Sequence, residues 1–417
     1  MDKVIPPNKN KVVHLQFGSS PSGNYTIRLH DALLEHGFDS FVLSLNSDVK
    51  GNPRIQNLGK KGLLIRKINQ RLQDYVTRKK SKIHGAFTLS FMGSDVSSHP
   101  LVKEADYIYI HWVLGGFLSV KSLDKLANLG KPLIMVMHDM WSLTGGCSYS
   151  FDCEKFLTHC GKCPLLISRK ENDVSYKQFE EKKKFYRKHD NIYLVSPSSW
   201  LFNLAKSAPL TQNKPVFQIP NPIDDTLFKP FDKHVAKKIL NMENYDHIIC
   251  FGANFINSPY KGWGYLKEAL HNLRDKLSEK KIGVLVFGNA SRQDLANEIP
   301  FDSKFMGFIR DDYTTNLIYN AADVFVAPSL ADNLPTTIIE SMCCGTPVVG
   351  FKTGGIPDII EHGRNGYLAD YKDAADFSKG IEYCLTNGLK GRLLPQFDKA
   401  IILEKHNDLF SFINHQA

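Results

Sequence analysis

The amino-acid sequence lacks any long hydrophobic run. Its most apolar segments, such as residues 133–137, have the length of a buried strand and fall far short of the roughly 18 apolar residues that span a membrane. Residues 1–11, MDKVIPPNKNK, contain no apolar core of a secretory signal, so we expect a cytoplasmic chain with reduced thiols. Glycine and proline, at 29 and 20 of 417 residues, form no repeat or low-complexity tract, which excludes collagen-like and disordered chains.

The composition that is present is typical of a globular protein with two or three domains. Hydrophobic residues make up 42% and charged residues 23% of the chain. The net charge of +9 favours an anionic partner, such as a phosphorylated ligand, an acidic membrane surface or a nucleic acid, or serves solubility alone. No helix-turn-helix, RNP-like motif or zinc-finger spacing is present, so we expect no nucleic-acid partner and rank a nucleic-acid-binding protein last.

Short β-branched runs alternate with amphipathic segments through both halves of the chain. This alternation predicts an α/β protein whose parallel sheets are covered on both faces, in two doubly wound, Rossmann-like domains. The proline-containing segment 219–224 marks a boundary. We therefore expect an N-terminal domain over 1–222, a C-terminal domain over 223–395, and a C-terminal helix over 396–417 that packs back on the N-terminal domain. The cleft between two such domains is the default ligand site.

A basic segment stands out over residues 60–82. It contains many Lys and Arg residues with Asp74 as its single acid, and apolar residues recur in it at helical spacing, at Leu64, Ile68, Leu72 and Tyr75. A basic amphipathic helix of this kind can lie on an anionic membrane surface. The alternative is a solvated surface helix whose apolar stripe packs on its own domain.

The densest group of candidate binding residues lies between residues 322 and 366. A buried strand there leads into a loop, and Pro335 suits the first position of the helix that follows. At the helix start Pro335-Thr336-Thr337, the free N–H groups of the two threonines form an anion site. Asp332 before the helix and Glu340 inside it can accept hydrogen bonds from sugar hydroxyls. The pattern predicts a site for a sugar–diphosphate–ribose ligand, and the alternative is an ordinary capped helix with solvated acids.

These residues resemble a known signature. Asp332-x7-Glu340, followed by GTPVV at 345–349, is similar to the Glu-x7-Glu signature of the retaining glycosyltransferases of the GT-B fold, glycosyltransferase family 4. FMGFI at 305–309, GGIP at 354–357, GRNGYL at 363–368 and IPNPID at 219–224 also resemble that family. The resemblance covers nearly all of the C-terminal half and, more weakly, the N-terminal half. It implies two Rossmann-like domains that face a central cleft.

The resemblance also implies roles for the matched positions. Glu340 holds the ribose hydroxyls of a nucleotide-sugar donor, Asp332 approaches the transferred sugar, and Lys261 neutralises the departing diphosphate. His138 faces the donor sugar, unless it is a structural histidine of the interior. The arginine that precedes the lysine in the family is absent, so we expect Asn254 or Arg310 to take its part. The remaining donor-binding positions are Gly23, Phe308, Asn333, Leu334, Thr336 and Thr337.

The activity that the resemblance implies is sugar transfer with retention. The donor would be a UDP- or GDP-linked sugar, and the acceptor a glycan or lipid-linked glycan in surface or exopolysaccharide synthesis, on the inner face of the cell membrane or in the cytoplasm. No catalytic metal is expected, because Lys261 and a helix N-terminus stabilise the leaving diphosphate. The alternative within the same fold is an epimerase or hydrolase of nucleotide sugars, which needs no acceptor.

Four of the eight cysteines fall in one short insertion, residues 145–164. They are Cys147, Cys153, Cys160 and Cys163. Four thiols this close in sequence, ending in a C-x2-C pair, suit a tetrahedral structural Zn²⁺, with His159 as a substitute for one of them. The alternatives are reduced thiols or a redox pair.

Overall fold

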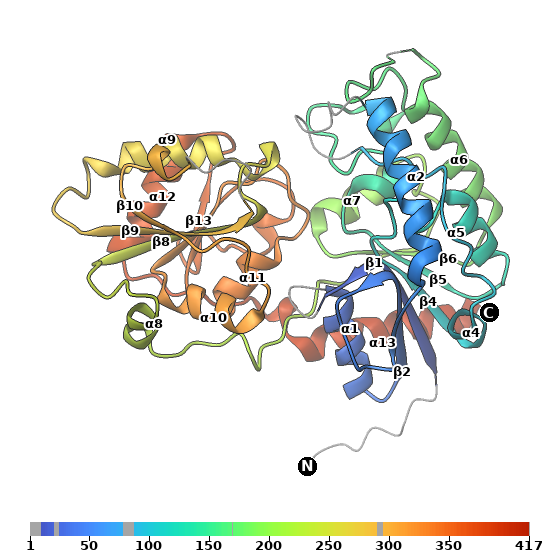
Figure 1. Ribbon diagram of the computed structural model, residues 1–417, viewed down its shortest axis with the longest axis horizontal. Coiled ribbons are helices and arrows are strands. Elements are labelled where there is room, and N and C mark those ends of the chain that lie inside the picture. The colour runs from blue at the N-terminus through green and yellow to red at the C-terminus, as the bar shows by residue number, and fades with distance from the viewer. Residues whose placement is uncertain (1–9, 21–24, 78–86, 169, 290–294, 417) are drawn as a thin grey trace. The chain divides into compact units, whose positions relative to one another are not determined.

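The computed structural model of the protein describes residues 10–20, 25–77, 87–168, 170–289 and 295–416. Its internal contacts divide the chain into two units (Figure 1). The first is formed by Met1–Pro222 with Lys399–Ala417, and the second by Ile223–Asp398. Each unit has its own parallel sheet, which confirms the expected α/β fold with two Rossmann-like domains.

The described part of the first unit contains a seven-stranded sheet in the order β3-β2-β1-β4-β5-β6-β7. All neighbouring strands pair in parallel, and the order reverses between β1 and β4. The strands are β1 (Lys11–Ser19), β2 (Asp39–Ser47), β3 (Ile55–Asn57), β4 (Tyr107–Ile110), β5 (Leu133–Val136), β6 (Ile192–Ser196) and β7 (Val216–Gln218).

Side-chain alternation along these strands builds a hydrophobic core on each face of the sheet. Ile108 and Met135 belong to one core, whereas their neighbours Tyr109 and Ile134 belong to the other. Successive residues of a strand point to opposite faces, so strands that are apolar on both sides must be covered on both sides. This is the physical reason why continuous β-branched runs in the sequence become central strands.

Helices cover the first sheet, and several begin at residues that favour a helix start. Ser119, Asp173 and Ser198 accept hydrogen bonds from backbone N–H groups in the first turns of α5, α6 and α7. The helices are α1 (Tyr25–Glu35), α2 (Gly59–Thr77), α4 (Pro100–Glu104), α5 (Val120–Ala127), η1 (Met140–Leu143), η2 (Lys155–Leu157), α6 (Val174–Lys188), α7 (Ser199–Ser207) and α13 (Lys399–Gln416).

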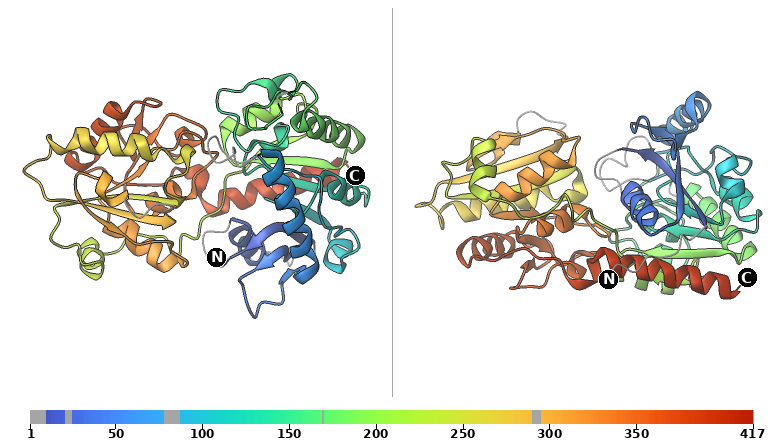
Figure 2. Two further views of the ribbon diagram at one scale, coloured as in Figure 1. Left: turned by 45° about the horizontal axis from the view of Figure 1, so that its top comes forward. Right: turned by 90° about the horizontal axis from the view of Figure 1, so that it is seen from below.

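The C-terminal helix α13 belongs to the first unit although it follows the second in sequence. It runs along the strands of that unit in Figure 2, and its apolar residues Ile402, Leu409 and Phe410 lie in the core on one face of the sheet. Polar contacts add to this packing, because the Tyr107 hydroxyl donates to Asn414 Oδ1 at 2.8 Å. The chain therefore crosses from the first unit to the second and back.

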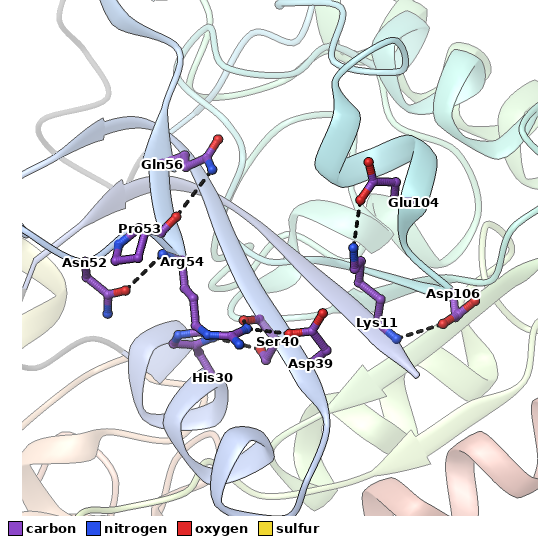
Figure 3. A network of polar contacts seen from close by, with 10 residues as sticks. All are labelled: Lys11, His30, Asp39, Ser40, Asn52, Pro53, Arg54, Gln56, Glu104 and Asp106. Atoms are coloured by element: carbon purple, nitrogen blue, oxygen red, sulfur yellow. Dashed lines mark hydrogen bonds and ion pairs between the residues drawn. The ribbon is translucent and has the colours of Figure 1, made fainter. Parts of the chain in front are cut away.

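Polar contacts hold the starts of β1 and β2 (Figure 3). The ammonium of Lys11 lies 2.7 Å from Glu104 Oε2, and its backbone N–H donates to Asp106 Oδ2 at 2.7 Å. Arg54 Nη1 lies 2.5 Å from Asp39 Oδ1. These contacts tie β1 to the segment before β4 and β2 to the segment before β3, which helps to set the order of the strands.

The described part of the second unit contains a six-stranded parallel sheet in the order β10-β9-β8-β11-β12-β13. Its strands are β8 (His247–Phe255), β9 (Ile282–Asn289), β10 (Asp302–Phe305), β11 (Val324–Ala327), β12 (Val348–Phe351) and β13 (Gly366–Ala369). Its helices are α8 (Lys233–Ile239), η3 (Pro259–Lys261), α9 (Trp263–Arg274), η4 (Leu295–Glu298), α10 (Asp312–Ala321), α11 (Thr336–Cys343), η5 (Ile356–Asp358), α12 (Ala374–Thr386) and η6 (Pro395–Phe397).

The second sheet is also buried on both faces, and its strand order marks a ligand-binding position. Ile249 and Val326 belong to one core, and Cys250 and Phe325 to the other. The order reverses between β8 and β11. Open α/β sheets bind ligands beyond the carboxyl ends of the strands at such a reversal. The loops that follow β8 and β11 are therefore the first place to look for a site.

The length and hydrophobicity of the helices show whether any of them could cross a membrane. No helix within the described ranges is both long and apolar enough to cross a membrane.

Candidate functional site

An ion pair joins the two loops at the reversal of the second sheet. Lys261, at the end of η3 after β8, places its ammonium 2.7 Å from Oδ2 of Asp332, in the loop after β11. The Ser329 hydroxyl lies 3.5 Å from the same oxygen. Both charged side chains are largely buried, and Asp332 is only 8% exposed. The two residues that the sequence singled out thus meet across 71 positions of the chain.

Two glycines allow these loops to approach closely. Gly262 has φ +71°, and a Cβ there would lie 1.8 Å from the Pro328 carbonyl oxygen. Gly354 has φ +55°, and a Cβ there would lie 1.8 Å from the Asp332 carbonyl oxygen. The backbone N–H of Leu330 also donates to the Tyr260 carbonyl at 2.7 Å. Only glycine fits at either position without strain. Gly354, the first residue of the GGIP motif, thus lets the backbone pack closely against the Asp332 carbonyl and helps to position Asp332.

The pairing keeps Lys261 charged. Burial, the largest single influence, lowers the pKa of its ammonium, but the charge and hydrogen bond of Asp332 outweigh it, so the pKa is raised above 10.5. The result is a fixed positive charge inside a partly dehydrated loop pair. The Asp332 carboxylate balances this charge, so the pair as a whole is neutral.

The start of α11 lies directly after this loop. The helix spans Thr336–Cys343. The sequence predicted Pro335 as the first helical residue, but Pro335 is the N-cap residue. Pro335 has no side-chain acceptor, and no side-chain capping bond forms at this end. Thr336 and Thr337 are half-buried in the first turn. Thus the N-cap residue leaves the amide groups of this turn without a side-chain cap, and such groups favour an anion.

Glu340 occupies the interior side of α11. It is 4% exposed, and its Oε2 accepts a hydrogen bond of 3.0 Å from the Tyr319 hydroxyl on α10. Burial, followed by the Glu340 charge, raises the pKa of Tyr319 well above 10, so the hydroxyl keeps its proton. Tyr319 fixes the carboxylate, and the sequence analysis did not assign it that role. No local signal could have shown it, because the two residues are 21 positions apart.

The other positions predicted in the second unit vary in exposure. Asn333 and Leu334 are buried in the loop that precedes α11. Phe308, just after β10, is 50% exposed. Asn254 on β8 and Arg310 after β10 are also exposed. An exposed aromatic ring such as that of Phe308 offers a face on which a base could stack, and this role stays a prediction.

In the first unit, His138 is the last of three histidines in contact. It follows β5, and its Nε2 lies 3.4 Å from Nδ1 of His111, whose Nε2 lies 2.9 Å from Nδ1 of His14. His14 is fully buried, and its Nε2 has no hydrogen-bond partner. A buried nitrogen without a partner costs less as an acceptor than as an N–H donor. We therefore assign the donated protons to Nδ1 of His14 and of His111, which leaves His138 with its proton on Nδ1.

Burial also fixes the charge of His138. It lowers the pKa of the imidazole to about 4, so His138 is neutral near pH 7. A neutral ring can hydrogen-bond a sugar hydroxyl but adds no charge. Gly23, the other donor-binding position predicted in this unit, lies outside the described residues.

Comparison with solved structures defines the class of fold. HepE of Anabaena, solved with UDP and glucose, matches with a TM-score of 0.59 and 18% identity, over 96% of this chain and 100% of that one. Sucrose-phosphate synthase of Thermosynechococcus elongatus matches with a TM-score of 0.63 and 16% identity, over 98% and 100%. The fold of the chain is GT-B.

Comparison with known sequences finds similarity to glycosyltransferases. Residues 246–387 match the family model of glycosyl transferases group 1. An uncharacterized glycosyltransferase of Haemophilus influenzae is 26% identical over 153 residues, which are 36% of this chain and 42% of that protein. D-inositol 3-phosphate glycosyltransferase of Mycobacterium sp. (strain KMS) is 27% identical over 177 residues, 40% of this chain and 38% of that protein. The chain thus spans about two fifths of the length of these relatives.

Proposed function

We propose that the protein is a retaining glycosyltransferase, which moves a sugar from a UDP- or GDP-linked donor to a glycan or a lipid-linked glycan. The Lys261–Asp332 ion pair carries this proposal, because it fixes an ammonium beside the start of α11 at the reversal of the sheet. A fixed cation and a helix N-terminus together suit a diphosphate. The group 1 match over residues 246–387 supports a donor-binding domain.

The transfer step follows from these groups. The acceptor oxygen forms a bond to C1 of the sugar as the bond from C1 to the diphosphate oxygen breaks, on the same face of the ring. A diphosphate oxygen takes the acceptor proton. Negative charge grows on the leaving group, and Lys261 and the N–H groups of α11 stabilise it in place of a divalent cation. His138, protonated on Nδ1, donates to a donor hydroxyl.

Glu340 gives the most direct test of the donor site. Calorimetry with UDP, GDP, ADP and CMP is expected to show binding of one nucleoside diphosphate, with UDP tested first because HepE was solved with it. Glu340→Gln keeps an acceptor for the Tyr319 hydroxyl but removes the charge that holds the ribose. We expect its binding to weaken at least tenfold, since hydrogen bonds to charged groups contribute about 1.5–3 kcal/mol.

The control is Glu382→Gln, which removes a carboxylate whose contact is an ion pair of 3.0 Å with Lys276 outside the site. It should leave nucleotide binding unchanged. Unchanged binding in Glu340→Gln, or no binding of any of the four nucleotides, would contradict the proposed donor site. Product analysis with and without a glycan acceptor then separates transfer from hydrolysis or epimerisation, because only transfer needs the acceptor.

We further propose that α2 attaches the protein to the anionic inner face of the cell membrane, where surface glycans are assembled on lipid carriers. The exposed fractions of Leu64, Ile68, Leu72 and Tyr75 are 62%, 40%, 41% and 80%, so the apolar stripe faces away from the domain. These exposed fractions favour the membrane-surface interpretation over the alternative, in which the stripe packs on the domain.

Other residues attach α2 to its domain. Among the residues of this helix whose burial is described, Gly62, Asn69 and Thr77 are buried, and Val76 packs against the cluster of Phe87 and Leu89. A Cβ at Gly116 would lie 2.9 Å from the Arg66 Cα and 3.1 Å from the Asn69 Cβ, which shows how closely the helix rests on the chain. The exposed stripe is flanked by the exposed cations Lys67 and Arg71. An apolar stripe with basic flanks complements an anionic lipid surface.

Co-sedimentation with vesicles tests this proposal. Binding to vesicles that contain phosphatidylglycerol is expected, and it should weaken with salt and be absent with pure phosphatidylcholine. Leu64→Ser with Ile68→Ser should weaken binding at least tenfold. The matched control is Val235→Ser with Ile239→Ser on α8, whose side chains are 46% and 59% exposed at the same spacing. Lack of binding to anionic vesicles at low salt, or equal losses in both pairs, would refute the role of α2.

A further inference from the structure

The cysteine-rich segment, residues 145–164, has little regular structure of its own. Its helical content is the single turn η2 (Lys155–Leu157). The small hydrophobic cluster beneath it contains Phe87, Leu89 and Cys163. Phe156 and Cys160 of the segment join the main core of the first unit. A loop of this length with so little regular structure gains further rigidity from a cross-link or a metal ion.

The four cysteines of this segment converge on one small cavity. All four carry free thiols. The cavity has a volume of about 20 Å³, room for about one ion, and its cysteine lining is Cys147, Cys153, Cys160 and Cys163. Three of them, Cys147, Cys153 and Cys163, also line a larger neighbouring cavity of about 300 Å³. All four cysteines thus line one small cavity, and three of them also line the larger cavity beside it.

Backbone N–H donors and one buried lysine, Lys182, lie near the sulfur atoms. The N–H of Gly145 donates to Cys160 Sγ at 3.1 Å, and the N–H of Leu165 donates to the Cys163 thiol. Lys182, 1% exposed, is held by the Thr144 carbonyl at 2.8 Å. A shell of four thiolates around Zn²⁺ carries two negative charges, which N–H donors and a nearby ammonium stabilise.

The structure removes His159 from the candidate ligands. Its Nδ1 lies 2.7 Å from the Cys160 carbonyl oxygen and its Nε2 lies 2.7 Å from Glu180 Oε1. Both ring nitrogens are therefore in use. The four cysteines are left as the ligand set.

We propose that these four cysteines bind one structural Zn²⁺ that fixes the fold of residues 145–164. Each thiol loses its proton on binding, so four protons leave as four Zn–S bonds form. In the described part of the chain, no group of three or more Cys, His, Asp or Glu side chains is already placed to hold a metal ion. Binding therefore draws the sulfur atoms inward to about 2.3 Å from the metal.

The first measurement is the metal content of the full chain, purified without a histidine tag. We expect about one zinc per chain, and about four thiols protected from reaction with a thiol reagent until a chelator is added. Replacement of zinc by Co²⁺ should give the visible absorption of tetrahedral thiolate cobalt. These readouts do not depend on sugar transfer, so their failure is distinct from failure of the proposed activity.

Two cysteine variants test whether the metal binds at the proposed cysteines. Cys153→Ser should lower the zinc content below about a tenth of the wild-type value, because three thiolates and a hydroxyl make a far weaker site. Cys343→Ser, which changes a cysteine on α11 of the second unit, should keep full zinc content. If Cys153→Ser does not fold, the Co²⁺ spectrum of the wild-type chain decides. Zinc near zero, with all thiols free or with disulfides found by mass spectrometry, would overturn the proposal.

Discussion

Replacing Lys261 with methionine is expected to lower the turnover number of sugar transfer about 10²–10³-fold. The dissociation constant of the nucleoside diphosphate should change less than about tenfold. The reason is that the leaving diphosphate gains charge as its bond to the sugar breaks, so a fixed ammonium stabilises the transition state more than the bound donor. Methionine keeps an apolar stem of similar length and removes only the charged end.

Loss of the ammonium also leaves the Asp332 carboxylate buried without its ion partner, which destabilises the fold. The variant Lys261→Met with Asp332→Asn removes this orphaned charge and tests whether a loss of turnover reflects chemistry or folding. Lys276→Met is the matched control, because Lys276 forms an ion pair of similar length, 3.0 Å, with the more exposed Glu382. Its turnover should equal that of the wild type.

The two kinetic constants decide the role of Lys261. If turnover in Lys261→Met equals the wild-type value, the lysine does not act on the leaving group. If kcat stays unchanged and KM rises, the lysine contributes only to ground-state binding. Either result would contradict the mechanism proposed above.

Lowering the pH from 7.5 to 5 is expected to destabilise the first unit by several kcal/mol. Its interior holds buried histidines that are neutral when folded. Burial lowers the pKa of His30 to about 4, with the Arg54 charge as a smaller cause, and burial lowers the pKa of His406 to about 3. The same cause lowers the pKa values of His14 and His111 well below 6.5. Figure 3 shows His30 and Ser40, whose side chains lie 2.8 Å apart.

The direction in which the free energy of unfolding changes with pH follows from proton uptake. Histidine in an unfolded chain titrates near pH 6.5. Between that value and the lowered folded values the unfolded chain binds more protons, so the free energy of unfolding rises with pH. The contribution is complete above about pH 6.5 and is lost as the pH falls toward 4. A histidine with a folded pKa of about 4 removes about 2 kcal/mol at pH 5, and several of them approach the total stability of a domain, about 5–15 kcal/mol.

Urea unfolding at pH 7.5, 6 and 5 measures this effect, with tryptophan fluorescence as the signal. The variant Trp263→Phe retains three tryptophans, Trp112, Trp141 and Trp200, which all lie in the first unit, so the signal reports on that unit. In the wild type, Nδ1 of His406 lies 2.9 Å from the Tyr109 hydroxyl oxygen. His406→Asn keeps a polar atom near that hydroxyl but removes a group that titrates. The slope of the unfolding free energy against pH should therefore fall by the equivalent of about one proton. His234→Asn, an exposed position on α8, should not change the slope. A stability that is flat from pH 7.5 to 5 would contradict the expectation.

The fold was readable from local patterns because strands and helices depend on neighbours in the chain. Apolar runs such as 108–110 and 324–326 became central strands, and the segment 219–224 lies where the second unit begins. Helix α2 shows the limit of this reasoning. Its amphipathic pattern predicts a helix whichever way it faces, and the close fit of Gly116 against Arg66 and Asn69 decided that the polar side packs inward.

The candidate site shows the same division. The signature with Asp332 and Glu340 is contiguous in sequence, so it could be found by resemblance. The partners that fix the two carboxylates, Lys261 and Tyr319, come from other strands and helices. The resemblance named Lys261 but not its ion pair, and nothing in the sequence assigned Tyr319 to Glu340.

By itself, the sequence determined the alternating elements, the two-domain organisation, the helix start at residues 335–337 and the grouping of four cysteines. These features depend on spacing along the chain. The tertiary structure alone decided which charges pair, which histidines are neutral and in contact, that His159 is already engaged, and which face of α2 meets solvent. Those properties depend on burial and on distances between residues far apart in the chain, which exist only once the chain has folded.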